Sequence, residues 1–507
     1  MSYPLRALVA LLLSTHAVLS SLPARAQEPV ISTPYSPPPA FAYTTPPEKN
    51  PVRGMLELSG FLAFGFLWYV TRTGISRSHY DLGYDWSMFR KKLSGEAVRL
   101  DTNELGTNYI GHPVGGTTYY VSMRSNQMGI GGSFAVAVGG SLLWEVFGEV
   151  HEILSLNDMI VTPLAGLAIG EAFMQLGGFF DRSSAALHNR MLAVLFTPVK
   201  SLNDLLDGRE LLRAEQVDAY GFPTNEWHQF DLGLGVANTW QASPSAGARP
   251  KLSQELRLTL SSRLARLPTF ATAGQYSLGF DDANVSSLEI RAAATTAGLV
   301  DIYLATNVVL AGGYMSEADG AGNGHGTLLG FAVGYQYSLH DYDRDGVRPR
   351  DRIASVQPLG LLFEHRAAFG ALQLFGRIDA GGEFAAVRPY ALRAYREIAD
   401  HTELSTVTVN HLYYFGLGGH VMATLGIASG PFDVECRARV DAYRQVGNRL
   451  SADDQRTALQ LRAGFTLGRT PLRISAFAER QSRAGQLAAA HAARHEVSAG
   501  IDVGARF

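Results

Sequence analysis

Three glutamates in a mainly apolar stretch of the N-terminal half have the spacing of a chemical site. Glu145, Glu149 and Glu152 lie at positions i, i+4 and i+7, which predicts one stripe on one helix face. Carboxylates this close repel one another unless a cation, a proton or a basic partner such as Arg124 compensates. The spacing therefore predicts a polar site or a network of ion pairs within apolar surroundings.

A histidine and an aspartate extend this glutamate stripe to a candidate site. His112 and Asp158 supply an imidazole and a further carboxylate, and both groups are common metal ligands. Crowded, buried carboxylates also suit general acid–base chemistry. The candidate catalytic residues are His112, Glu145, Glu149 and Asp158, with Asp101, Arg124, Glu152 and Glu171 in support. The metal and any cofactor stay unknown at this stage.

The segments that must position these residues differ in character along the chain. Residues 1–26 are typical of a secretory signal peptide, with an apolar core before an Ala-Arg-Ala cleavage motif. Residues 27–53 are rich in proline, which favours an extended linker. Residues 54–215 have helical character, and the stretch from Ser155 to Asp158 has the form of a capping box that begins a helix.

From about Glu226 the hydrophobic period changes to two. In residues 432–442 apolar side chains alternate with charged ones, the latter being Asp433, Glu435, Arg437, Arg439 and Asp441. About 12 such segments follow one another, and many approach the length needed to span a membrane at a tilt. We therefore predict an α+β fold, with a helical block at 54–215 and an antiparallel transmembrane β-barrel at 226–507.

The chain ends on an alternating strand whose last residue is Phe507. Such an ending resembles the signal that bacterial outer-membrane barrels present to the barrel assembly machinery. We therefore predict the cell outer membrane as the location, with outer-membrane lipid and the assembly machinery as partners. A periplasmic β-domain is the alternative. The oligomeric state is left open.

Composition excludes some classes of partner and site. The net charge is −3 and the basic residues alternate with acidic ones, so no nucleic-acid surface is predicted. The single cysteine, Cys436, excludes an internal disulfide and is predicted to face lipid. Asp341, Asp343 and Asp345 resemble the start of a calcium loop, but Arg352 occupies the position of the bidentate glutamate. A solvated loop is favoured there.

The helical block carries a resemblance to a known family. Residues of about 95–175 resemble the bacterial family catalogued as domain of unknown function 3943. The matching positions are His112-Pro113, Gly116, Tyr119-Tyr120, Arg124, Trp144-Glu145, Glu149, Glu152, Ser155, Asp158, Pro163, Gly166 and Gly170-Glu171. The resemblance implies a signal peptide and a barrel-like tail, and no reaction. Asp101, His112, Glu145, Asp158 and Gly166 also resemble a pattern of VanZ-like membrane proteins, which would indicate envelope lipids or glycolipids.

Two functions follow from these observations. The first is a barrel in envelope structure or gated passage of a small or lipidic substrate, whose helical block plugs the lumen or caps its periplasmic mouth, with the plug favoured. The carboxylates would then neutralise arginines of the lumen, which are Arg257, Arg291, Arg437, Arg439, Arg462, Arg473 and Arg506. The alternative is a membrane-embedded enzyme that acts on envelope lipid or glycolipid. A site that opens sideways towards lipid would favour the enzyme.

Overall fold

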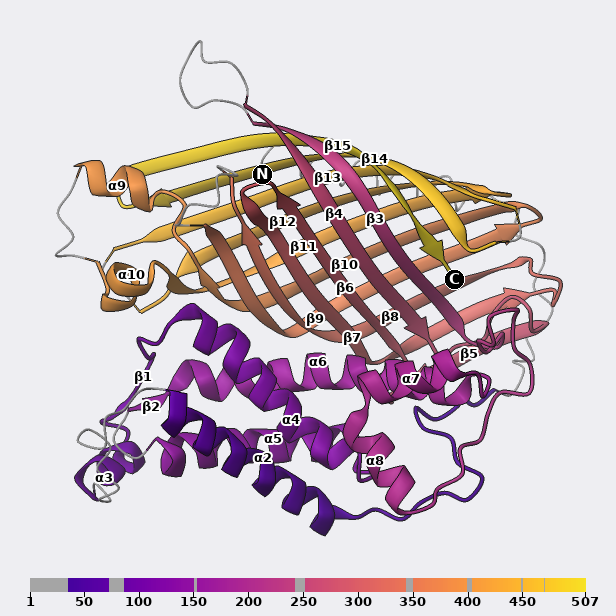
Figure 1. Cartoon of the computed structure of the whole chain (residues 1–507), viewed down its shortest axis with the longest axis horizontal. Coiled ribbons are helices and arrows are strands. Elements are labelled where there is room, and N and C mark those ends of the chain that lie inside the picture. The colour runs from indigo at the N-terminus through magenta and orange to yellow at the C-terminus, as the bar shows by residue number, and fades with distance from the viewer. Residues whose placement is uncertain are drawn as a thin grey trace.

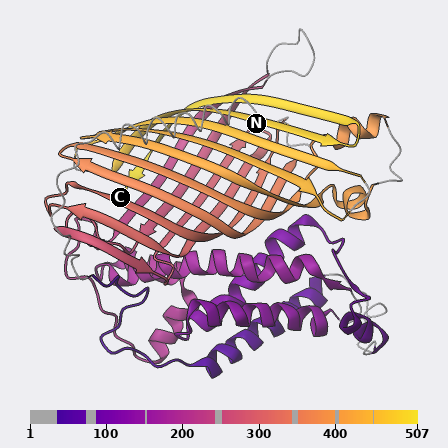
Figure 2. The same cartoon turned by 180° about the vertical axis from the view of Figure 1, so that it is seen from behind.

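The computed structural model consists of a β-barrel and a bundle of helices that lies along the outside of its wall (Figures 1 and 2). It describes residues 35–72, 86–149, 153–241, 251–342, 350–398, 404–447, 450–468 and 470–507. The predicted signal peptide lies outside the described residues, and so do Glu152 and the calcium-loop candidates Asp343 and Asp345.

The barrel is an antiparallel sheet that closes on itself. Its 13 strands form one sheet in which β15 pairs with β3, and the short β5 pairs only with one end of β7. The remaining twelve strands form the wall, which confirms the predicted α+β fold and strand number. The strands are β3 (Trp227–Gln241), β4 (Lys251–Ala265), β5 (Gly274–Phe280), β6 (Val285–Thr295), β7 (Gly298–Ala318), β8 (Gly324–His340), β9 (Asp351–Phe369), β10 (Leu372–Val387), β11 (Tyr414–Ser429), β12 (Phe432–Gln445), β13 (Ala452–Thr466), β14 (Leu472–Leu487) and β15 (Ala490–Arg506).

The two faces of the wall have opposite chemistry. Leucine, isoleucine and valine side chains on the outer face are exposed, including Leu234, Leu258, Leu461 and Ile501. The alternating polar residues face the lumen, and all seven predicted lumen arginines lie there. An exposed apolar face this extensive is stable against hydrocarbon and costly against water.

The two ends of the barrel also differ. At the end where the C-terminus lies, the connections are two-residue turns at 370–371 and 430–431, short loops at 319–323 and 467–471, and the longer segment 266–284. At the other end, which we call the long-loop end, segments 242–250, 341–350 and 388–413 join strands, beside two-residue turns at 296–297 and 488–489. Outer-membrane barrels place short turns in the periplasm and longer loops outside the cell. We therefore expect the long-loop end to lie at the outer leaflet.

The helices form a bundle whose main members run along the barrel axis (Figure 1). They are α2 (Pro51–Arg72), α3 (Trp86–Ser94), the π-turn η1 (Thr107–Gly111) that leads into α4 (His112–Arg124), α5 (Ile130–Leu143) with the π-turn η2 (Trp144–Gly148), α6 (Leu156–Arg182), α7 (Leu187–Phe196) and α8 (Pro198–Leu206). The two-residue strands β1 (Val98–Arg99) and β2 (Leu154–Ser155) pair with each other. Two short helices, α9 (Leu392–Ile398) and α10 (Thr406–His411), lie in the segment between β10 and β11.

Helix α6 is the central helix of this bundle. Its 27 residues span about 40 Å, more than the ~30 Å hydrocarbon thickness of a bilayer. By length and composition, α6 and the segment Ile130–Gly148 qualify as candidate membrane spans among the described residues. Ser155 accepts a hydrogen bond from the Asp158 amide and caps α6, as predicted, but the Ser155 amide donates to Glu145 and not to Asp158, so only this half of the predicted capping box forms.

The bundle packs against the outer face of the barrel. Tyr109, Val161 and Ala168 of the helices share one core with Val308, Tyr335 and Val356 of strands β7, β8 and β9. The Tyr335 hydroxyl donates a hydrogen bond to the Tyr109 carbonyl. The lumen cavity is lined by residues 224–506 and by none of the described residues of the bundle.

The described helices therefore neither plug the lumen nor cap its mouth, so that prediction is wrong for them, and Glu145 and Glu149 do not neutralise lumen arginines. The physical reason is the surface of the bundle. Leu56, Phe64 and Leu67 of α2 and Leu142 of α5 are exposed, and such side chains match lipid and not a charged, wet lumen.

Candidate functional site

Three of the predicted site residues meet near the long-loop end of the bundle. Ligand atoms of His112, Glu145 and Asp158 all lie within 4.8 Å of one another. The Nε2 atom of His112 is 3.4 Å from Oδ2 of Asp158. Glu145 and Asp158 are fully buried, whereas 11% of the His112 side chain is exposed. We call these three residues the HED cluster.

Each residue of the HED cluster comes from a different helical segment. His112 is the first residue of α4, at the junction where the helical backbone of η1 continues directly into α4. Asp158 lies in the first turn of α6, held by the Ser155 cap. The Ser155 amide in turn donates a 2.8 Å hydrogen bond to Oε2 of Glu145. The N-terminus of α6 therefore orients both carboxylates, and its dipole favours negative charge there.

The π-turn η2 determines the direction in which the Glu145 side chain points. It inserts a residue into the helical repeat after α5 ends at Leu143. Glu149 then has φ −105° and ψ 59° and ends the helix. Its Oε1 accepts a 3.1 Å hydrogen bond from the Trp144 indole. The predicted single stripe of Glu145 and Glu149 is therefore wrong, and Glu149 lies outside the HED cluster.

Asp101 lies beside the HED cluster and is already saturated with donors. Its carboxylate accepts hydrogen bonds from the side-chain amides of Asn103 at 2.8 Å, Asn108 at 2.7 Å and Asn157 at 3.2 Å. Its amide donates to Oδ1 of Asn157. Asp101 therefore supports the site as a fixed negative group that joins η1 to α6, which agrees with a positioning role.

The sequence did not single out the asparagines, Lys92 or Tyr413, which also surround the site. Asn157 donates to Oδ1 of Asp158 at 3.0 Å. The buried Lys92 ammonium donates to the backbone carbonyls of Glu145 and Glu149, so it caps the end of η2. Tyr413 accepts from Asn108 and donates to Asn103. Only Asn157 carried a sequence signal, because it is adjacent to Asp158.

Within the HED cluster, the hydrogen bonding of Asp158 is incomplete. Oδ2 of Asp158 is buried and accepts no hydrogen bond from any described residue, although His112 Nε2 is close. A buried carboxylate oxygen left in this state costs free energy. The oxygen points into the cluster, so a proton, a cation or a substrate group there would stabilise the site.

Arg124 and Glu171 form a separate cluster where the last residue of α4 lies beside α6. Two guanidinium nitrogens of Arg124 donate to the two carboxylate oxygens of Glu171 at 2.8 and 2.9 Å. The Tyr120 hydroxyl and the Gln175 amide also donate to Glu171. Because the carboxylate is saturated and fully buried, this pair is structural and does not extend the HED cluster.

Exposed apolar side chains lie close in sequence to each residue of the HED cluster. The chain neighbours of the three residues include Ile110, Val114, Leu142 and Leu156, which are 46%, 59%, 40% and 43% exposed. His112 is the partly exposed member of the cluster. A molecule that approaches it therefore comes from the apolar surface beside the barrel and not from the lumen.

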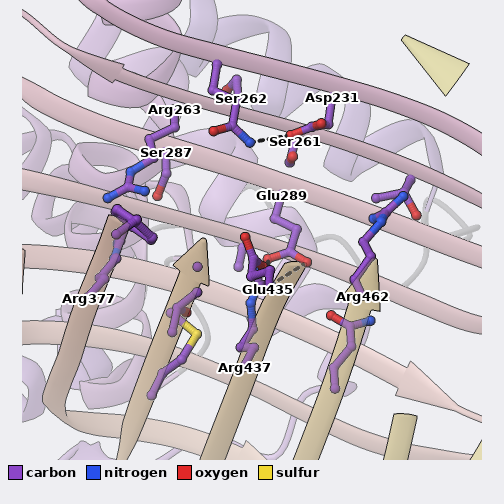
Figure 3. A pocket seen from close by; sticks show the side chains of 18 of the residues that line it. Asp231, Ser261, Ser262, Arg263, Ser287, Glu289, Arg377, Glu435, Arg437 and Arg462 are labelled. Carbon is purple, nitrogen blue, oxygen red and sulfur yellow. Dashed lines mark hydrogen bonds and ion pairs between the residues drawn. The ribbon is translucent and has the colours of Figure 1, made fainter. Parts of the chain in front are cut away.

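The lumen holds a second candidate, a cavity of about 600 Å³ lined by charged side chains (Figure 3). Arg437 of β12 pairs with Glu289 of β6 at 3.0 Å. His340 of β8 and Glu496 of β15 are 2.8 Å apart. These strands are not neighbours in the wall, so both pairs bridge the lumen and narrow it.

Comparison with known proteins identifies one family model that matches part of the chain. Residues 97–199 match the family described as a domain of unknown function, DUF3943, so the predicted resemblance is confirmed for that segment. The VanZ-like resemblance stays a prediction. No curated protein matches the chain.

Several solved barrels resemble the chain at low identity. An anion-selective porin from Comamonas acidovorans is 9% identical, and the alignment covers 56% of this chain and 99% of the porin at a TM-score of 0.20. OmpT of Vibrio cholerae is 7% identical over 58% of this chain and 99% of its own, at 0.22. The translocator domain of NalP from Neisseria meningitidis is 12% identical over 61% and 95%, at 0.20. Scores this low carry no inference about function.

Proposed function

We propose that this protein is an outer-membrane enzyme that acts on envelope lipid or glycolipid, with the barrel as anchor and the HED cluster as active site. One observation carries the proposal. Three ionisable side chains converge in a helical bundle on the lipid-facing side of a barrel. Ionisable groups at membrane depth are costly and are a mark of function.

The chemistry that this arrangement supports is acid–base catalysis at a lipid headgroup. The imidazole of His112 is the partly exposed group, so it is placed to take a proton from a nucleophile or to give one to a leaving group. Asp158 lies directly behind it at 3.4 Å and stabilises the imidazolium that forms. Glu145 completes the buried negative side of the site.

The position of the HED cluster favours lipid of the outer leaflet as substrate. Asn108 donates both to Tyr413, which precedes β11, and to Asp101 beside the cluster. The Tyr109 hydroxyl donates to the carbonyl of Phe384 near the end of β10. Both contacts lie at the long-loop end, which we expect to face the cell exterior. The outer leaflet of such membranes contains glycolipid, which has the polar headgroup that the site requires.

The test is the lipid profile of cells that carry substituted protein. Cells that carry His112→Ala, Glu145→Gln or Asp158→Asn should have the same outer-membrane lipid profile as a strain from which the gene is deleted. The profile is measured by mass spectrometry. Heat-modifiability on gels reports whether the barrel is folded in each variant. Folded variants with wild-type lipid profiles would contradict the proposal.

The lumen cavity is the observation that favours a second function, passage of a small solute. The bridging pairs Arg437–Glu289 and His340–Glu496 oppose it, because they cross the path. Conductance separates the two functions and is treated below as a property of the whole molecule.

A further inference from the structure

The HED cluster has the composition and spacing of a metal site with an open position. One imidazole and two carboxylates are a donor set that Zn²⁺ and related transition metals accept. Catalytic zinc sites use three protein ligands and leave the fourth position for water or substrate. His112 Nε2, a Glu145 oxygen and an Asp158 oxygen supply three ligand atoms from three helical segments.

The distances leave room for one ion and require only small movements. Atoms that all lie within 4.8 Å of one another share a point no more than about 2.8 Å from each. Zn–N and Zn–O bonds are about 2.0–2.2 Å. Side-chain rotations that move each ligand atom by a few tenths of an ångström would shorten these distances to bonding lengths. The partly exposed edge of His112 leaves the fourth coordination position open.

The hydrogen bonds around the cluster point to the same ligand. Oδ2 of Asp158 is buried and accepts no hydrogen bond from the described residues, while Oδ1 is held by Asn157. Oε2 of Glu145 is held by the Ser155 amide. Each carboxylate is therefore oriented by a fixed donor on one oxygen, as outer-shell partners orient metal ligands.

The neighbouring carboxylates are engaged in other interactions. Asp101 accepts three amide donors, and Glu149 accepts the Trp144 indole. Two anionic ligands and a neutral imidazole together neutralise a divalent cation. A site with no net charge has the smallest desolvation penalty in the low-dielectric interior of the bundle.

We propose that His112, Glu145 and Asp158 bind one divalent transition-metal ion, with Zn²⁺ as the first choice, and leave one coordination position open towards the lipid surface. The proposal deepens the proposed function, on whose site it rests. The metal would act there as a Lewis acid on a headgroup oxygen or would lower the cost of forming hydroxide from water.

The experiment measures metal binding by the full-length protein in detergent, without reference to activity. Protein treated with chelator is titrated with Zn²⁺ alone and, for a spectroscopic signature, with Co²⁺ alone. Wild type should bind one equivalent. His112→Ala, Glu145→Gln and Asp158→Asn should each weaken binding by more than about 100-fold, because loss of an outer-shell partner alone costs about 10–100-fold.

Glu149→Gln is the matched control, since it removes a carboxylate four residues from Glu145 and outside the cluster. It should still bind one equivalent. Glu145→Gln and Asp158→Asn preserve side-chain shape, so they remain informative if His112→Ala does not fold. No stoichiometric binding by wild type, or equal losses in Glu149→Gln and Glu145→Gln, would overturn the metal site.

The outcomes separate the two proposals. Metal binding that depends on the three residues, with unchanged lipid profiles in the variants, would uphold the metal site and contradict the lipid enzyme. Altered lipid profiles without metal binding would uphold acid–base catalysis by the same residues and contradict the metal site.

Discussion

At the level of single residues, the helical bundle contains buried carboxylates of two kinds, which differ in their hydrogen bonding. Glu171 is saturated by Arg124, Tyr120 and Gln175. Asp158 instead presents a buried oxygen to which no described residue donates. A satisfied buried pair is costly to break but chemically inert, whereas an unsatisfied oxygen beside an imidazole is ready for a ligand.

Glu171→Gln should therefore act on stability and leave the HED cluster intact. Loss of Glu171 leaves the buried Arg124 charge with the longer 3.6 Å ion pair to Asp282, and the loss of one partner of a buried pair costs about 3–5 kcal/mol. Unfolding of the helical bundle in detergent, followed by circular dichroism, measures the effect.

Glu104→Gln is the control for this prediction because Glu104 is an exposed carboxylate of the same block. Substitutions of that kind change stability by less than about 0.5 kcal/mol. A Glu171→Gln protein as stable as the Glu104→Gln protein would show that the buried pair contributes nothing.

At the level of elements, the crossing of α4 and α6 sets the geometry of the site. A Cβ atom on Gly116 would lie 1.8 Å from the Thr162 carbonyl oxygen, and one on Gly166 would lie 2.4 Å from the Gly116 carbonyl oxygen. Only glycine permits this approach, which is the way that small residues let membrane helices pack closely. Because α4 carries His112 and α6 carries Asp158, their separation determines the distance between these two side chains.

Gly116→Ala should push α4 away from α6 and disrupt the site. Overpacking costs about 1–3 kcal/mol, so the bundle should unfold at lower temperature. Metal binding should weaken, and the outer-membrane lipid profile should shift towards that of the deletion strain. The barrel should keep its heat-modifiability.

Gly115→Ala is matched to Gly116→Ala in chemistry and position. A Cβ atom there would meet only the Tyr119 hydroxyl, at an ordinary 3.7 Å. Its bundle should be as stable as wild type. Because alanine has a higher helix propensity than glycine, equal destabilisation by the two substitutions would contradict the close crossing as the cause.

For the whole molecule, the barrel and the bundle meet through their apolar faces and leave the lumen to the barrel alone. The shared core joins α4 and α6 to strands β7, β8 and β9. The lumen is crossed by charged pairs between strands that do not adjoin. A barrel wall that is cross-linked by these ion pairs resists deformation. It therefore supports the bundle rigidly within the membrane.

The purified protein should therefore show little or no conductance in planar bilayers. Removing the bridge with Arg437→Ser together with Glu289→Ser should open the lumen and raise the conductance several-fold. Arg444→Ser with Asp453→Ser is the control, since that pair links neighbouring strands at an exposed end. A large wild-type conductance would support solute passage as the function.

Much of the architecture follows from the sequence because side chains on a strand alternate strictly between two faces. The alternation of Asp433, Glu435 and Arg437 with apolar residues is sufficient to place these groups in a lumen. The cap at Ser155 is equally local, so the start of α6 was predictable. The spacing of Arg124 and Glu171 gave no such information, because their pairing joins two helices.

Only the tertiary structure decided which surfaces meet and which site residues converge. Apolar helices and a barrel with an apolar exterior are compatible with several arrangements, and burial of those two apolar faces against each other selected the outside of the wall. The local period predicted a stripe of Glu145 and Glu149, but the π-turn separated them. His112 and Asp158 are 46 residues apart in sequence, and the glycine crossing of α4 and α6 brought them together.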